Sequence, residues 1–156
     1  MGSKEAKYLR LQSQINNLLT NTDDLIAGMA TVNAVLYHKM QQFFWVGFYL
    51  LKKNRLIVGP YQGPVACQEL ELNMGVCWAS LNTGRAVIVP DVNKFPGHIA
   101  CDYRSKSEIA LPVTDGTGNK IGVFDVDSSG LNTFDNIDAI FLERIIRHLM
   151  DAVSRS

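Results

Sequence analysis

The sequence has no surplus of charge of either sign and no long apolar run. Fifteen Lys and Arg residues balance fifteen Asp and Glu residues, so the formal net charge at pH 7 is +0. No sequence-wide positive field exists to gather nucleic acid, which we therefore do not predict as a partner. No apolar stretch approaches the roughly 18 residues that span a bilayer, and the opening segment lacks the apolar core of a signal peptide. We expect a cytoplasmic protein that does not enter the membrane.

Cysteine is scarce, and its spacing does not match a metal site. The three cysteines are Cys67, Cys77 and Cys101, and no Cys-x-x-Cys pair occurs. His98 stands three residues before Cys101, which resembles half of a zinc site, but the other half is missing. We predict no metal and no cofactor. In a reducing compartment a transient catalytic disulfide is more plausible than a permanent one, and the odd number leaves one thiol outside any pair.

The composition is that of an ordinary globular domain. Of the 156 residues, 47% are apolar and 19% are charged, which predicts one domain over residues 1–156. Hydrophobic periodicity divides it into a helical segment at about 5–38, a sheet with loops at about 43–128, and a helix at about 135–153. This order predicts an α/β (α+β) fold in which a central, mostly antiparallel sheet is flanked by N-terminal and C-terminal helices.

Shorter sequence patterns predict the strands, a helix and the connections of the sheet region. The expected strands are 43–51, 56–58, 68–72, 86–89, 108–113 and 120–127, with two hairpins among them. Gly75 to Asn82 predicts a short helix that Gly84 closes in a left-handed cap. The connection at 90–106 has no clear period, and a loop of this length in a compact domain is usually functional.

Acidic side chains gather at the end of one hairpin. Alternation in the strand 120–127 places Asp125 and Asp127 on one face, and Glu108 opens the strand expected to pair with it. Three neighbouring carboxylates repel one another unless a cation or protons lie among them, and an amino acid's ammonium group would supply the charge. The alternative is that the end of the strand is wet and its two aspartates merely solubilise the next loop. Cys101 is seven residues before Glu108, so its thiol can reach the same pocket, although an isolated cysteine is more often a small buried hydrophobe.

Several stretches together are similar to a known family. They are Trp45-Val-Gly-Phe-Tyr-Leu-Leu51, Gly59-Pro-Tyr-Gln-Gly-Pro-Val-Ala-Cys67, Gly75-Val-Cys77, Phe95-Pro-Gly-His-Ile-Ala-Cys-Asp102, Ser105-Lys-Ser-Glu-Ile109 and Ile121-Gly-Val-Phe-Asp-Val-Asp-Ser128. In this combination the chain resembles the free methionine-(R)-sulfoxide reductases, which are single GAF domains. The resemblance implies thiol-dependent reduction of free methionine-(R)-sulfoxide through a cysteine sulfenic acid and an intramolecular disulfide. It also implies a thioredoxin-like dithiol protein as the reductant.

The resemblance assigns roles position by position. Cys101 becomes the nucleophile, and either Cys67 or Cys77 the resolving thiol. The acidic residues contact the substrate, with Glu108 or Asp127 as proton donor to the oxygen. The remaining contacts are Asp125 for the ammonium group, Trp45 and Tyr49 as an aromatic wall, and the backbone N–H groups of Ile99, Ala100 and Cys101 for the carboxylate.

Two positions depart from the family pattern. Trp78 follows Cys77 where the family usually has glycine, and Asn93 stands where histidine is common. If Trp78 covers Cys77, Cys67 is the direct resolving partner. An alternative function is a non-catalytic GAF module that binds a small ligand such as a cyclic nucleotide, although three carboxylates would repel a phosphate. A third is a dimerising domain, and a homodimer is also compatible with catalysis.

Overall fold

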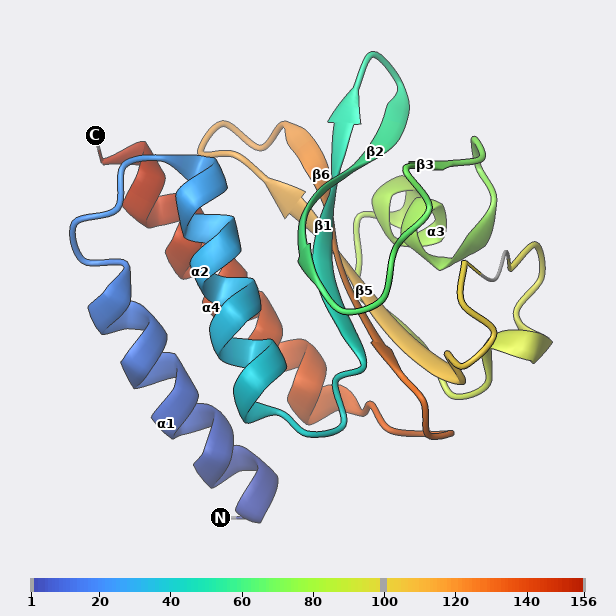
Figure 1. Ribbon diagram of the computed structural model, residues 1–156. Helices are drawn as coiled ribbons and strands as arrows, with labels where there is room; N and C mark the ends of the chain where they lie inside the picture. The colour runs from blue at the N-terminus through green and yellow to red at the C-terminus, as the bar shows by residue number, and fades with distance from the viewer. Residues whose placement is uncertain (1, 99–100, 156) are drawn as a thin grey trace.

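A computed structural model describes residues 2–98 and 101–155 (Figure 1). Within them, one antiparallel sheet has the strand order β3-β2-β1-β6-β5-β4. The strands are β1 Trp45–Lys52, β2 Arg55–Gln62, β3 Glu69–Leu70, β4 Val87–Val89, β5 Ser107–Thr114 and β6 Lys120–Ser128. The helices are α1 Ser3–Leu18, α2 Leu25–Lys39, α3 Gly75–Thr83, the 3-10 turn η1 Val92–Lys94 and α4 Asn136–Ser154. The predicted α+β class is confirmed.

The sheet separates two apolar layers. Helices α1, α2 and α4 cover one face, and α3 with the long connections lies on the other (Figure 1). On the helix face the core contains side chains such as Phe48, Phe124 and Leu142. On the opposite face a smaller core contains Trp45 and Trp78. No helix of the described chain is long and apolar enough to cross a bilayer.

The terminal helices are joined at one buried carboxylate. Asp135 caps α4 and forms a capping box with Asp138, which satisfies N–H groups that the first turn leaves free. The Tyr8 hydroxyl of α1 donates a hydrogen bond of 2.5 Å to Asp138, and Lys4 forms an ion pair of 2.7 Å with it. The charge of Asp138 is therefore neutralised where α1 crosses the start of α4.

The sequence boundaries agree within about two residues for most elements. The strand expected at 68–72 is shorter, because β3 contains only Glu69 and Leu70, and two other elements differ. Strand β2 continues to Gln62, beyond the predicted end at residue 58, although Gly59 and Pro60 interrupt its pattern. Proline is tolerated because β3 pairs only with Leu56 and Ile57, so β2 lacks a neighbour on that side at Pro60. The turn η1 was not predicted. Gly84 does close α3 in the left-handed conformation, with a φ of 70°.

Candidate active site

Three carboxylates meet on the α3 face of the sheet. Glu108 of β5 pairs with Asp127 of β6, and Asp125 lies two residues earlier on the same strand. Glu108 is 6% exposed and Asp125 3% exposed, while Asp127 is partly buried. All three line one cavity of ≈ 300 Å³. The alternative of a wet strand end, at which the two aspartates only solubilise a loop, is therefore wrong for Asp125.

The cavity favours the neutral forms of these acids. Burial raises the pKa of Glu108, Asp125 and Asp127 well above their ordinary values, and the charge of a neighbouring acid adds to the effect in each case. Within the described chain, Oδ1 of Asp125 is buried and has no hydrogen-bond partner. A buried acceptor of this kind is costly unless a ligand supplies a donor. The site therefore has a place for a hydrogen-bond donor beside Asp125.

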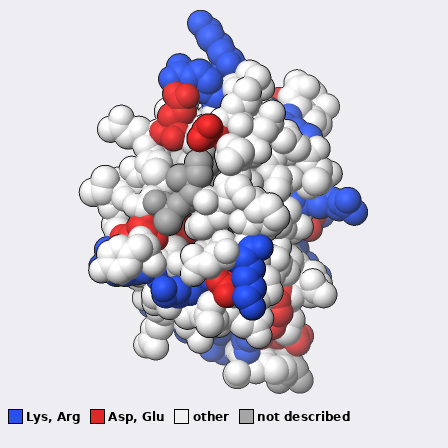
Figure 2. Space-filling model, turned by 90° about the vertical axis from the view of Figure 1, so that its right-hand side faces the viewer, with Lys and Arg blue, Asp and Glu red and all other residues white. Residues whose placement is uncertain are grey.

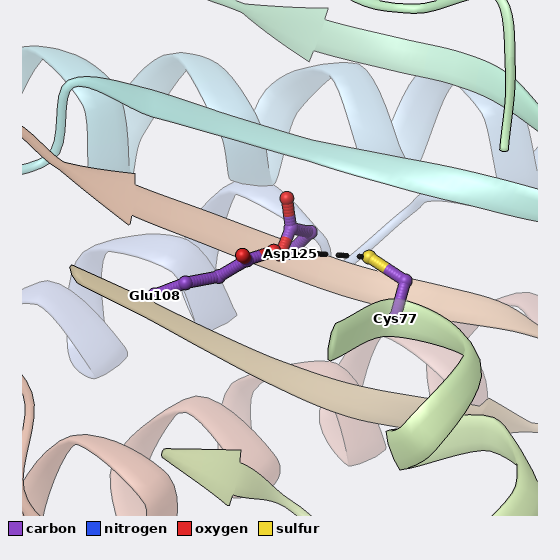
Figure 3. Close-up of side chains that lie close together, drawn as sticks. All are labelled: Cys77, Glu108 and Asp125. Carbon is purple, nitrogen blue, oxygen red and sulfur yellow. Dashed lines mark hydrogen bonds between the residues drawn. The ribbon is translucent and has the colours of Figure 1, made fainter. Parts of the chain in front are cut away.

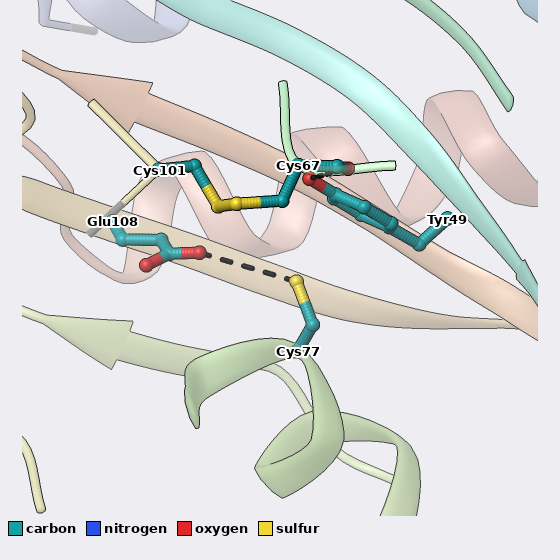
Figure 4. The surroundings of a disulfide bond; sticks show 5 residues. All are labelled: Tyr49, Cys67, Cys77, Cys101 and Glu108. Carbon is teal, nitrogen blue, oxygen red and sulfur yellow. Dashed lines mark hydrogen bonds between the residues drawn. A yellow bond between two sulfur atoms is a disulfide. The ribbon is translucent and has the colours of Figure 1, made fainter. Parts of the chain in front are cut away.

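Two of the three cysteines form a disulfide beside the acids (Figure 4). The bond joins Cys67, from the connection between β2 and β3, to Cys101, with their Cα atoms 5.5 Å apart. Both line the cavity. Cys77 of α3 is a buried free thiol, and its Sγ lies 4.0 Å from Oε2 of Glu108. The sequence left the partner of Cys101 open, and in the structure it is Cys67.

Aromatic rings close another side of the cavity. The Trp45 ring stacks on Tyr49 at a centroid distance of 5.7 Å and on Tyr61 at 5.2 Å. Gly47 makes this arrangement possible, because a Cβ atom there would lie 2.6 Å from Cη2 of Trp45. The Tyr49 hydroxyl donates to the carbonyl of Cys67 at 3.5 Å. Trp45 and Tyr49 line the cavity as expected, and Tyr61, which the sequence did not single out, stacks on Trp45 without lining the cavity.

The connection that carries Cys101 is anchored on the C-terminal side of the cysteine. The Asp102 carboxylate accepts a hydrogen bond of 2.7 Å from Arg104, and this partner lowers the pKa of Asp102 to about 2. The Arg104 guanidinium lies 5.0 Å from the centre of the Phe44 ring. Further along, Lys106 donates a backbone hydrogen bond of 2.7 Å to Ser128. The predicted contacts from Ile99 and Ala100 lie outside the described residues.

The expectation of no metal rested on sequence spacing, and the fold brings other potential ligands together. One sulfur and two carboxylate oxygens, from Cys77, Glu108 and Asp125, lie within 4.8 Å of one another (Figure 3). Such atoms are suitable ligands for zinc. Burial also raises the pKa of the Cys77 thiol, so a metal ion would have to displace protons from this set. An ammonium group can interact with the same acids without a change in the thiol.

The chain is similar to proteins of one family over nearly its whole length. The GAF domain family matches residues 31–154. GAF domain-containing protein A of Dictyostelium discoideum is 50% identical over 149 residues, which cover 95% of this chain and 93% of that protein. The free methionine-R-sulfoxide reductase of Saccharomyces cerevisiae is 39% identical over 129 residues, covering 78% of this chain and 72% of that protein.

A solved structure gives the same result. Free methionine-R-sulfoxide reductase from Neisseria meningitidis, solved by X-ray methods in complex with its substrate, matches with a TM-score of 0.93 at 36% identity. The match covers 99% of this chain and 92% of that chain. The fold and the site define a GAF domain with a cysteine pair. Within the GAF domain family, the chain belongs to the free methionine-R-sulfoxide reductases.

Proposed function

We propose that this chain reduces free L-methionine-(R)-sulfoxide to methionine, with the Cys101 thiol as nucleophile and Cys67 as resolving thiol. One observation carries the proposal: the Cys67–Cys101 bond lines the same ≈ 300 Å³ cavity as the buried acids and Trp45. A cavity of this size lies at the lower end of small-molecule sites and suits a single amino acid. The names of the relatives support the same substrate.

Binding uses the two unlike halves of the cavity. The substrate ammonium group lies against Asp125, whose Oδ1 has no partner in the described chain. The S-methyl group packs on the apolar face of Trp45, which is 5% exposed. We further propose that the backbone near Cys101 binds the carboxylate. A residue inside a peptide lacks both free charged groups, so the site selects the free amino acid.

The chemical step transfers one oxygen atom. The Cys101 sulfur attacks the sulfoxide sulfur, while Glu108 or Asp127 donates a proton to the sulfoxide oxygen. A carboxyl group can donate this proton near neutral pH because burial raises its pKa. The protonated oxygen then passes to the Cys101 sulfur as the new bond between the two sulfur atoms breaks, which gives methionine and a sulfenic acid on Cys101. The Cys67 thiol then displaces water from this sulfenic acid to form the disulfide, which an external dithiol reduces.

Cys77 has a secondary place in this scheme. It is outside the disulfide and buried, and burial together with the nearby acids raises the pKa of its thiol. A thiol with a high pKa provides little thiolate for attack on a sulfenic acid. We therefore expect Cys77→Ala to retain most of one turnover, whereas Cys101→Ser abolishes the reaction.

The direct test offers both sulfoxide epimers to the reduced protein. Each epimer is supplied as the free amino acid and within a peptide, with dithiothreitol as reductant, and its loss is followed by chromatography. We expect consumption of the free R epimer alone. Full activity of Cys101→Ser, or equal consumption of a peptide substrate, contradicts the proposal. Calorimetry with cyclic nucleotides tests the alternative of a non-catalytic ligand-binding module, and we expect no binding.

A further inference from the structure

The two most exposed large apolar side chains of the described residues both flank the disulfide. Val65 is 83% exposed and Tyr103 82% exposed, whereas the next, Leu131, is 61% exposed. Val65 lies two residues before Cys67, and Tyr103 lies two residues after Cys101. Apolar surface in water costs free energy, and its concentration beside one reactive bond indicates a surface that another molecule covers.

The position of Tyr103 is fixed by contacts of the neighbouring residues and not by contacts of its own ring. Asp102 and Arg104 pair with each other, and Arg104 also lies over the Phe44 ring. The Ser105 N–H donates to the Asp102 carbonyl at 3.2 Å, which closes the turn around Tyr103. The backbone of the turn is therefore ordered while the tyrosine ring faces solvent. An aromatic ring presented in this way loses little conformational entropy on binding, which is typical of interface residues.

One of the two cysteines of the disulfide is exposed to solvent. Cys101 is exposed, and Cys67 is partly buried. Figure 2 shows the side of the molecule that carries α3 and these connections, and uncoloured side chains occupy much of the middle of the face. Basic and acidic side chains both lie around this area in the same view. Because charges of both signs surround it, this surface carries no strong field of one sign.

We propose that Val65 and Tyr103, with the Cys67–Cys101 bond, form the docking surface for a small protein that carries an accessible dithiol within an apolar surface. This inference rests on the proposed function, which leaves the disulfide to be reduced after each turnover. A low-molecular-weight thiol reacts without such a surface, since it needs only access to sulfur. The disulfide specifies the partner's chemistry, and the two apolar side chains specify that the partner is a protein.

The reduction is a balanced two-electron exchange. A thiolate of the partner attacks one sulfur of the Cys67–Cys101 bond, which breaks, and the other sulfur leaves as a thiolate and takes a proton. The mixed disulfide is then attacked by the partner's second thiolate. The chain regains two thiols, and the partner becomes a disulfide. Val65 and Tyr103 contribute by holding the partner during the first attack.

The test isolates that first attack and needs no sulfoxide. The oxidised chain is mixed with a thioredoxin whose second active-site cysteine is replaced by serine, and formation of the mixed disulfide is timed by mass spectrometry. Tyr103→Ser and Val65→Ser are each expected to slow this reaction about threefold to tenfold, as expected for truncated interface residues. Reduction of the same bond by dithiothreitol should stay within about twofold of the wild type, because a small thiol needs only access to sulfur.

Leu18→Ser is the matched control, because Leu18 is 52% exposed on α1. It should leave both rates unchanged. An equal loss with dithiothreitol, or no loss with thioredoxin, overturns the docking surface. Loss of self-association in Tyr103→Ser, with an unchanged thioredoxin rate, would instead make the surface an interface between two copies. If the reduced wild type consumes no sulfoxide with dithiothreitol, the proposed function fails separately, because the trapping rates do not depend on it.

Discussion

Replacement of Asp125 by asparagine should weaken substrate binding and stabilise the ligand-free protein. Asp125 is 3% exposed, and its Oδ1 lacks a partner among the described residues, so asparagine keeps the shape and removes the ionisable group. In the complex the ammonium group favours the ionised form of Asp125, and a hydrogen-bonded contact with a buried charge is worth about 2–3 kcal/mol. At about 1.4 kcal/mol per factor of ten, KM should rise roughly 30-fold to 150-fold. kcat should change much less, because Asp125 binds a group that does not react.

The same substitution should weaken substrate binding but increase the stability of the ligand-free protein. Burial raises the pKa of Asp125 in the folded chain, so above the unfolded pKa the native state retains a proton that the unfolded chain has lost. The free energy of unfolding therefore falls as pH rises from the unfolded pKa, near 4, towards the raised folded pKa. Asparagine cannot ionise, so it removes this pH-dependent loss of stability. The free energy of unfolding should then fall less steeply with pH, by up to about 1.4 kcal/mol per pH unit.

Two measurements on the same variant check this reasoning. Steady-state kinetics with free methionine-(R)-sulfoxide and dithiothreitol give KM and kcat, and urea unfolding at several pH values gives the stability. Asp151→Asn is the control, because Asp151 is an exposed acid on α4. An unchanged KM together with lower stability at neutral pH would refute both the ammonium contact and the assigned cost of burial.

Three further changes test other parts of the structure. Tyr8→Phe removes the donor to Asp138 and should lower the free energy of unfolding by about 2 kcal/mol, measured with urea. Glu108→Gln should reduce kcat about 100-fold if Glu108 is the acid. The wild-type rate should then fall as pH rises through the raised pKa of Glu108, and the variant should lose this step. Gly47→Ala should displace Trp45 and raise KM at a cost of about 1–3 kcal/mol in stability, seen in kinetics and unfolding.

Local patterns in the sequence located most of the fold. Period-two alternation in β6 placed Asp125 and Asp127 correctly, because a strand fixes which residues share a face. The hairpin of β5 and β6 then brought Glu108 opposite Asp127. The extent of β2 was missed, since tolerance of Pro60 depends on how far the neighbouring strand β3 reaches. That length is a property of the sheet and has no local sequence signal.

The partner of Cys101 and the ring that stacks on Trp45 both depended on distant parts of the chain. Cys67 and Cys101 are separated by 34 residues and lie in two irregular connections, whose paths no periodicity describes. Tyr61 stacks on Trp45 because β2 lies beside β1 and extends to Gln62. The motif that contains Tyr61 was visible, but its contact required the true length of the strand. The family resemblance supplied the candidate residues, and only the fold brings them together around one cavity.

The burial of Cys77 affects how the redox state of this protein is measured by thiol labelling. A thiol that is 4% exposed, with a pKa raised by burial and by nearby acids, reacts slowly with alkylating reagents. In native buffer the disulfide form would take up almost no label although it contains a free thiol. Reduction would then add the thiols of Cys67 and Cys101, of which Cys101 is exposed, and only denaturation would reveal the third. A native thiol titration thus reports the Cys67–Cys101 pair with little background.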